Sequence, residues 1–225
     1  MCFSAEASFG AAAALAGIGG LSVCRAPSRA HVPFAAIPLV FAAQQVCEGL
    51  VWLAVRDAPF HRSETSIARV FLFFALMLWP AYIPGALAPI EASRERRWAL
   101  VGFSGGGLAL GAYLMSCATL RRSDACIAFD NLYYWVQFDA PLKPFMALTY
   151  ATFIIVPLFV SSVRGTTLLA VVAFLSFSAT GLLYRAGFIS VWCFVAAVLS
   201  GITASISALG RGTRGRLLAV PTSNQ

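Results

Sequence analysis

The sequence is poor in charged side chains. Only 11% of its 225 residues are Asp, Glu, Lys or Arg, whereas 60% are hydrophobic. A soluble domain carries about 25% charged residues, so most of this chain is expected to avoid water. Lysine occurs once, at Lys143, and arginine therefore supplies nearly all of the net charge of +7. Because the arginines are scattered over short connections, they favour membrane orientation and contact with lipid headgroups over nucleic-acid binding.

The usual residues of a hydrolase are also missing. The two histidines, His31 and His61, lie at opposite ends of one apolar segment, and neither Gly-x-Ser-x-Gly nor His-Glu-x-x-His occurs. A Cys2 or Cys193 nucleophile would have no visible base beside it. The last apolar segment contains no lysine for a retinal Schiff base. An enzyme is therefore the weaker interpretation of this sequence.

Apolar segments of membrane-spanning length are abundant. About 20 apolar residues in a helix cross the ~30 Å hydrocarbon core, and seven such segments follow one another: 5–24, 32–55, 67–90, 98–118, 143–163, 166–184 and 187–209. We therefore predict an all-α polytopic membrane protein with seven transmembrane helices. They form a single domain over 1–210, and the basic stretch 211–225 is expected to be a flexible cytoplasmic tail.

The one long connection between these segments covers residues 119–142. Its central part is dense in Tyr, Trp and Phe beside polar residues, which predicts a helix lying in the outer headgroup region. A lid over an outer cavity, with Asp130 or Asp139 facing inward, is the alternative.

Arginine also indicates the orientation. With the N-terminus outside and the C-terminus inside, the two compact clusters at 94–97 and 211–216 both lie on the inner side, as the positive-inside rule requires. Cys117 and Cys126 then lie at the outer surface, where an oxidising compartment permits a disulfide. Two free thiols are an equally open alternative.

The second apolar segment contains polar residues that are unfavourable in hydrocarbon. Gln44 and Glu48 are four residues apart and Gln45 and Glu48 three apart, so they share one helix face, which Trp52 continues. A charged side chain at mid-bilayer costs roughly 2.5–3.5 kcal/mol. This face is therefore expected to point at protein or water rather than lipid.

Other polar residues fall in the same outer half of the membrane in this orientation. We predict an outward-facing polar pocket with these ligand-binding residues: Glu48, Gln44, Gln45, Trp52, Glu6 and Trp192. The leading interpretation is binding or translocation of a small solute or ion, with Glu48 as a protonatable site. Equally open is a structural role, in which Glu48 only hydrogen-bonds a neighbouring helix.

A metal or redox site is the alternative function. Cys2 with its N-terminal amine, Glu6 and Cys193 offer soft ligands suited to copper or zinc, as in a membrane metal-binding or sensor protein. Their spacing matches no standard motif, and buried cysteine often serves as a small apolar filler.

Glycine and proline mark two further features. Glycines at four positions of segment 98–118 predict a tight helix contact, either within the chain or in a homo-oligomer: Gly102, Gly106, Gly107 and Gly111. In segment 67–90, Trp79-Pro80 and Pro84 predict a kinked helix.

Several of these blocks together resemble a known family. They are Met-Cys-Phe-Ser-Ala at the N-terminus, Gln-Gln-x-x-Glu-Gly-x-x-Trp at 44–52, Leu-Trp-Pro at 78–80 and Ser-Val-Trp-Cys-Phe at 190–194. This pattern is similar to an uncharacterised bacterial integral membrane family, a domain of unknown function. The resemblance spans nearly the whole chain and implies location in the bacterial cytoplasmic membrane, but it implies no activity.

Overall fold

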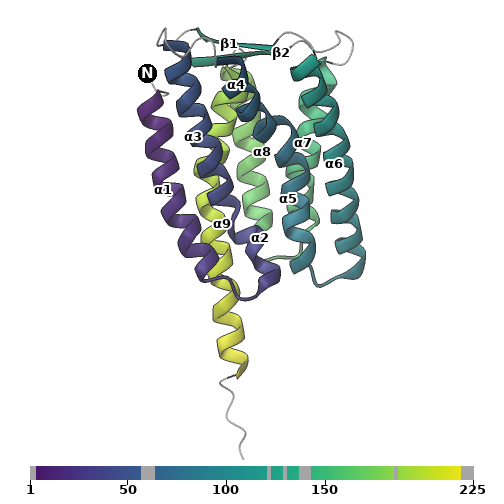
Figure 1. Ribbon diagram of the computed structural model, residues 1–225. Helices are drawn as coiled ribbons and strands as arrows, with labels where there is room; N and C mark the ends of the chain where they lie inside the picture. Colours follow the sequence, from purple (N-terminus) through teal and green to yellow (C-terminus); the bar gives the residue numbers. More distant parts are fainter. Residues whose placement is uncertain are drawn as a thin grey trace, which may run out of the picture.

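Helices make up nearly all of the computed structural model, which describes residues 4–56, 64–120, 123–128, 131–136, 143–184 and 187–218. They stand side by side along one direction, and a two-stranded hairpin lies across one end (Figure 1). The predicted all-α fold is confirmed. In chain order the elements are α1 (Ala5–Cys24), η1 (Arg29–His31), α2 (Val32–Ala35), α3 (Ile37–Arg56), α4 (Glu64–Leu72), η3 (Phe73–Leu78), α5 (Trp79–Leu87), η4 (Ala88–Ile90), α6 (Arg94–Leu120), β1 (Ser123–Ala128), β2 (Asn131–Val136), α7 (Lys143–Val160), α8 (Thr166–Leu183) and α9 (Phe188–Leu218).

Several of these helices are suited to a bilayer. Among the described residues, five helical stretches are long and apolar enough to cross a membrane: Ala5–Cys24, Arg29–Arg56, Ser66–Ile90, Arg94–Leu120 and Thr166–Leu183. Two shorter apolar helices cover Phe145–Val160 and Phe188–Ala204. All seven segments predicted from the sequence are thus helical.

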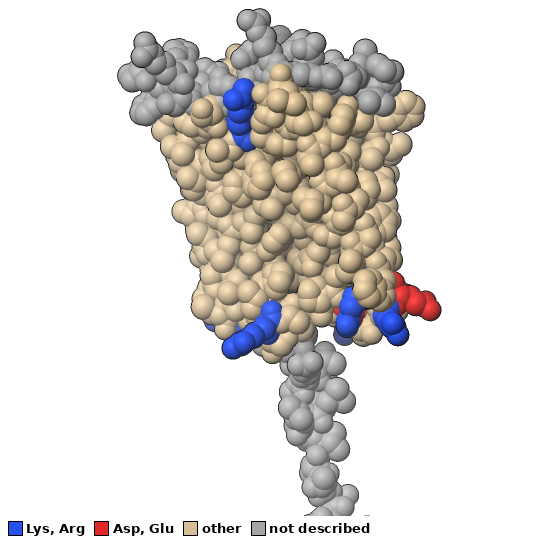
Figure 2. Space-filling view, turned by 45° about the vertical axis from the view of Figure 1, so that its right-hand side comes forward, with Lys and Arg blue, Asp and Glu red and all other residues tan. Residues whose placement is uncertain are grey.

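The outer surface of the bundle has the same character. Figure 2 shows a broad belt free of described charged side chains, with arginines at either end. Large apolar side chains such as Trp98, Leu148 and Leu182 are 63%, 67% and 73% exposed on this surface. Apolar exposure on this scale is unfavourable in water and favourable in lipid. The fold is therefore that of a membrane protein.

The third apolar segment contains a π-helical turn rather than a simple proline kink. In η3 the N–H of Trp79 donates to the carbonyl of Phe74, one residue further back than in an α-helix. The same pattern would pair the carbonyl of Ala75 with the N–H of residue 80, which proline lacks. The hydroxyl of Tyr150 on α7 donates to this carbonyl instead, at 2.5 Å.

Helix α6 packs against this irregular segment through two glycines. A Cβ added to Gly107 would lie 2.0 Å from the carbonyl oxygen of Pro80, and one added to Gly111 would lie 2.6 Å from the Cα of Met77. In an α-helix the carbonyl of Pro80 would accept a hydrogen bond from the N–H of residue 84, but Pro84 has no N–H. The close approach of α6 at Gly107 covers this unpaired carbonyl oxygen. The predicted tight helix contact therefore exists, and it is made within the chain.

The other two glycines of that group behave differently. Gly106 faces the ring of Phe153 on α7, whereas Gly102 has no atom within 4 Å of an added Cβ. Three of the four glycines are thus engaged inside the molecule. A homo-oligomer through this helix stays a prediction, with Gly102 the position left open for it.

The connection between α6 and α7 is a β-hairpin, so the predicted interfacial helix is wrong. Strands β1 and β2 pair antiparallel, with Cys126 opposite Tyr133. On β2, Leu132, Tyr134 and Val136 alternate along the chain and are 0%, 7% and 9% exposed. This period of two, in a stretch rich in aromatic and β-branched residues, is typical of a half-buried strand. Asp130 and Asp139 lie outside the described residues.

At the opposite end of the bundle, Glu91 joins two connections. Its carboxylate accepts hydrogen bonds from the N–H of Ser162 at 2.7 Å, the hydroxyl of Ser161 at 3.2 Å, the hydroxyl of Ser162 and the N–H of Ser93 at 3.3 Å. Arg97 donates to the Glu91 carbonyl at 2.8 Å. Burial opposes ionisation, but these hydrogen bonds hold the pKa of Glu91 below its ordinary value. Glu91 therefore connects the α5–α6 and α7–α8 turns.

Candidate functional site

The polar face predicted on the second apolar segment is buried inside the bundle. Gln44 and Gln45 are fully buried on α3, Glu48 is 1% exposed and Trp52 is 4% exposed. Helical spacing places them on one side of α3, which packs against α1, α4 and α9. No side chain of this face points to the lipid.

Uncharged groups hold the Glu48 carboxyl in place. Gln45 Nε2 donates to one carboxyl oxygen at 3.0 Å, and the hydroxyl of Ser190 on α9 donates to the other. Neither of these two hydrogen-bond partners carries a charge. A carboxylate in such surroundings is costly when ionised, because no positive charge compensates for its lost hydration.

Gln44 connects the same face to the third apolar segment. Its Oε1 accepts a hydrogen bond of 2.6 Å from the indole of Trp79, and its amide lies beside the thiol of Cys193. Trp79 in turn stacks on Phe41, with ring centroids 3.7 Å apart. Helices α3, α5 and α9 therefore meet at Gln44.

The hairpin contributes a residue to this cluster. Tyr134 stacks on Phe71 of α4 with ring centroids 4.7 Å apart, and its phenol lies within electrostatic reach of Glu48. We define the Glu48 cluster as Gln44, Gln45, Glu48, Trp52, Tyr134 and Ser190. The alternation along β2 is the sequence feature that indicates Tyr134, and Ser190 belongs to the 190–194 block that carries the family resemblance.

Four polar atoms of the Glu48 cluster have no hydrogen-bond partner among the described residues. They are Gln44 Nε2, Gln45 Oε1, Trp52 Nε1 and the Tyr134 hydroxyl. Leaving a buried polar group unsatisfied costs roughly 1–3 kcal/mol. Unsatisfied donors and acceptors in the same cluster as a buried carboxyl are suited to holding water or a small polar ligand.

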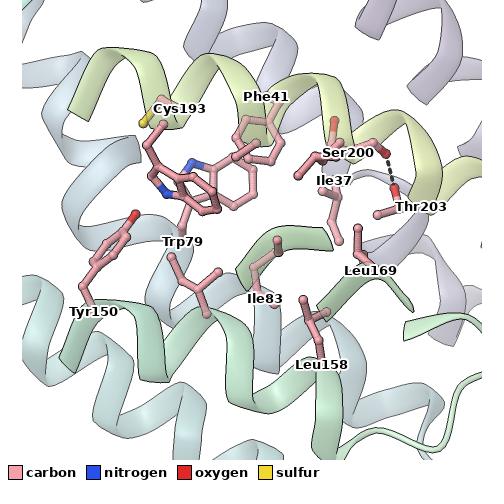
Figure 3. A pocket seen from close by; sticks show the side chains of 15 residues that line it. Ile37, Phe41, Trp79, Ile83, Tyr150, Leu158, Leu169, Cys193, Ser200 and Thr203 are labelled. Carbon is pink, nitrogen blue, oxygen red and sulfur yellow. Dashed lines mark hydrogen bonds between the residues drawn. The ribbon is translucent and has the colours of Figure 1, made fainter. Parts of the chain in front are cut away.

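Two cavities lie beside this cluster, and their walls are apolar. One of about 210 Å³ lies between η3, α6, α7 and α9, and one of about 60 Å³ between α3, α5, α7, α8 and α9. Trp192 lines both, whereas Gln44, Gln45, Glu48 and Trp52 line neither. Figure 3 shows the smaller cavity, with Tyr150 and Cys193 at one end and Ser200 and Thr203 at the other.

The remaining predicted site residues are dispersed. Glu6 is exposed near Arg56, and its side chain is hydrogen-bonded to Ser4. The structure therefore does not bring Glu6 into the Glu48 cluster. Cys193 is 2% exposed, and Cys2 lies outside the described residues. Within the part of the chain that the structure describes, no three His, Cys, Asp or Glu side chains form a group able to hold a metal ion.

Cys117 and Cys126 are free thiols in the structure, so it does not contain the disulfide that the sequence left open. Cys117 is buried at the end of α6, whereas Cys126 is exposed on β1. The hairpin turns the Cys126 side chain away from the bundle, because residues of the same strand alternate between its two faces.

Comparison with known proteins places the chain in a family. A model described as a family of unknown function, DUF6629, matches residues 1–216. The chain belongs to this family. The resemblance noted in the sequence is thereby confirmed, and the DUF6629 match includes the whole Glu48 cluster. No curated protein and no solved structure matches the chain.

Proposed function

We propose that this DUF6629 protein crosses the bacterial cytoplasmic membrane seven times, with its N-terminus outside and its C-terminus inside. The distribution of arginine supports this orientation. Of the arginines whose side chains the structure describes, six lie at the end of the bundle opposite the hairpin, namely Arg25, Arg29, Arg94, Arg96, Arg97 and Arg164. Two described arginines, Arg56 and Arg69, lie toward the hairpin. The positive-inside rule assigns the arginine-rich end to the cytoplasm.

In this orientation the Glu48 cluster binds a proton or a small cation in the outer half of the membrane. Glu48 precedes the end of α3 at Arg56 by about 12 Å, at ~1.5 Å per residue. The observation that carries the proposal is a buried carboxyl whose two hydrogen-bond partners are uncharged, in a cluster with four polar atoms that have no hydrogen-bond partner among the described residues. A carboxyl in this setting avoids bare charge by holding a proton or a cation.

Exchange of that proton for a cation would couple the site to solute movement. Gln45 Oε1 supplies a neutral oxygen ligand beside the carboxyl, as hard cations prefer. The hydroxyl of Tyr134 lies on the hairpin side of the cluster, so movement of the hairpin would expose Glu48 to the outside. The proposed function is binding or translocation of a small ion or solute, centred on Glu48.

Glu48→Gln tests this proposal, because glutamine keeps the shape of the side chain but cannot release a proton. In proteoliposomes containing a pH-sensitive dye, we expect an imposed sodium or potassium gradient to drive proton movement with the natural protein. Glu48→Gln should abolish this movement.

The matched control is Glu95→Gln, at an exposed carboxylate near the inner surface, which should leave the movement unchanged. Circular dichroism and the melting temperature establish that both variants fold. Proton movement by Glu48→Gln at the natural rate would overturn the proposal.

A further inference from the structure

The two apolar cavities lie next to each other, and we call the pair the tract. Along α7 their walls run from Met146 to Leu158, about 18 Å at ~1.5 Å per residue. Along α9 they run from Phe188 to Thr203, about 22 Å by the same rise. Tyr150, Trp192 and Cys193 line both cavities and mark the point where they adjoin. The tract is thus somewhat longer than one leaflet of hydrocarbon, ~15 Å.

The polar groups that line this tract are engaged elsewhere. The hydroxyl of Tyr150 donates to the Ala75 carbonyl at 2.5 Å, and the Trp79 indole donates to Gln44. At the inner end, Ser200 and Thr203 donate at 2.6 Å to carbonyls of their own helix (Figure 3). A buried water needs two to four polar partners. These walls offer mainly carbon, so the tract favours an apolar occupant over water.

The larger cavity, which we call the outer cavity because it lies nearer the hairpin end of α7, reaches the surface of the bundle; the smaller one is the inner cavity. Ala147 on α7 lines this cavity and is exposed, and Met146, Phe188 and Ile189 line it and are partly exposed. The residues that line the inner cavity are mostly buried. A molecule dissolved in the bilayer can therefore enter between α7 and α9 near Ala147 and extend inward.

The geometry points to a binding site for a single linear hydrocarbon chain, acyl or isoprenoid, inserted between α7 and α9. Length, apolar walls and access from the lipid side all fit such a chain. The outer cavity, at about 210 Å³, exceeds the ~150 Å³ of an engineered apolar cavity that binds benzene. This site is separate from the Glu48 cluster and goes beyond the ion binding proposed above.

Photolabelling of the full-length protein in lipid nanodiscs tests the site. One probe is palmitic acid with a diazirine in mid-chain, and the other is farnesol with a diazirine on its isoprenoid chain. We expect mass spectrometry to find the label on wall residues such as Tyr150 and Trp192, and unlabelled probe to compete with it. The probe that labels more strongly shows whether the chain is acyl or isoprenoid.

Two variants that place a bulky side chain in the tract, and one control variant, test whether the label reports this site. Ala147→Trp blocks the entry and Ala173→Phe fills the inner cavity, so each should reduce labelling of the wall residues about tenfold. Leu148→Trp is the matched control, because Leu148 is 67% exposed and lines neither cavity; it should keep the labelling. Label that persists in both filling variants, or that is confined to lipid-facing residues such as Leu168, would overturn the inference.

Discussion

Glu91 is a single buried carboxylate on which the end of the bundle opposite the hairpin depends for stability. Its folded-state pKa is lowered, so its ionised form stabilises the fold above the unfolded pKa of about 4.5, and this stabilisation is lost as the pH falls through the folded value. In Glu91→Gln the amide Nε2 would face a backbone N–H in either orientation, that of Ser162 or that of Ser93, donor against donor. We expect this variant to lose roughly 1–3 kcal/mol of unfolding free energy near neutral pH.

Thermal unfolding of the purified protein between neutral pH and about pH 3 measures this loss. The difference between the natural protein and Glu91→Gln should shrink as the pH falls. Glu95→Gln, at an exposed neighbour on α6, should match the natural protein throughout. A difference that does not change with pH would show that the charge of Glu91 is unimportant.

The burial of the polar residues on α3 could be predicted from the sequence, whereas their hydrogen-bond partners could not. Burial of Gln44, Gln45, Glu48 and Trp52 follows from helical spacing and the cost of polar groups in lipid, and both are local properties. The contact of Glu48 with Ser190 joins positions 142 residues apart. Nothing in a single sequence shows which distant positions come into contact, so hydrogen-bond partners of this kind could not be predicted.

At the scale of elements, the contact between α6 and the π-helical turn depends on the absence of a side chain at Gly107. An added Cβ would overlap the Pro80 carbonyl oxygen at 2.0 Å, and backbone atoms cannot move aside without displacing a helix. Gly107→Ala should therefore lower the unfolding free energy by about 1–3 kcal/mol or more. Unfolding in detergent, followed by circular dichroism, measures this change.

Gly102→Ala is the control, on the same helix but facing open space. Alanine favours a helix over glycine by about 1 kcal/mol, so this variant should be as stable as the natural protein or more so. Equal destabilisation by both substitutions would contradict the packing described for α6.

The helices themselves were predictable, because length and hydropathy suffice to identify them. The glycine spacing also predicted a close contact, though its partner was not evident. The hairpin was missed because its aromatic density was attributed to a membrane interface, whereas the alternation of Leu132, Tyr134 and Val136 indicates a strand. The π-helical turn depends on Tyr150 replacing a backbone donor, and that replacement requires tertiary structure.

At the scale of the whole molecule, two natural cysteines report the orientation. Cys24 is exposed at the end of α1 and Cys126 is exposed on β1, at opposite ends of the bundle (Figure 1). With the N-terminus outside, a membrane-impermeant maleimide added to intact cells should modify a variant that retains only Cys126. A variant that retains only Cys24 should react after permeabilisation of the cells. The reverse pattern would invert the proposed topology.

The overall plan of the bundle is more predictable than its interior. Low charge and the long apolar segments indicate a membrane helix bundle, whereas the orientation inferred from arginine stays a prediction. The sequence placed a single polar pocket at Glu48, whereas the structure separates an enclosed polar cluster from apolar cavities. That separation depends on how bulky side chains such as Trp79 and Trp192 fill the space between helices, which hydropathy does not describe.

The π-helical turn has a consequence for biosynthesis. The carbonyl of Ala75 obtains its donor from Tyr150, and the carbonyl of Pro80 is covered by Gly107, both of which leave the ribosome later than α5. Until then these oxygens lack a partner in lipid, which is unfavourable. The third apolar segment therefore obtains a donor for the Ala75 carbonyl only after α7 is synthesised. Folding of this segment during translation depends on the later helices packing against it.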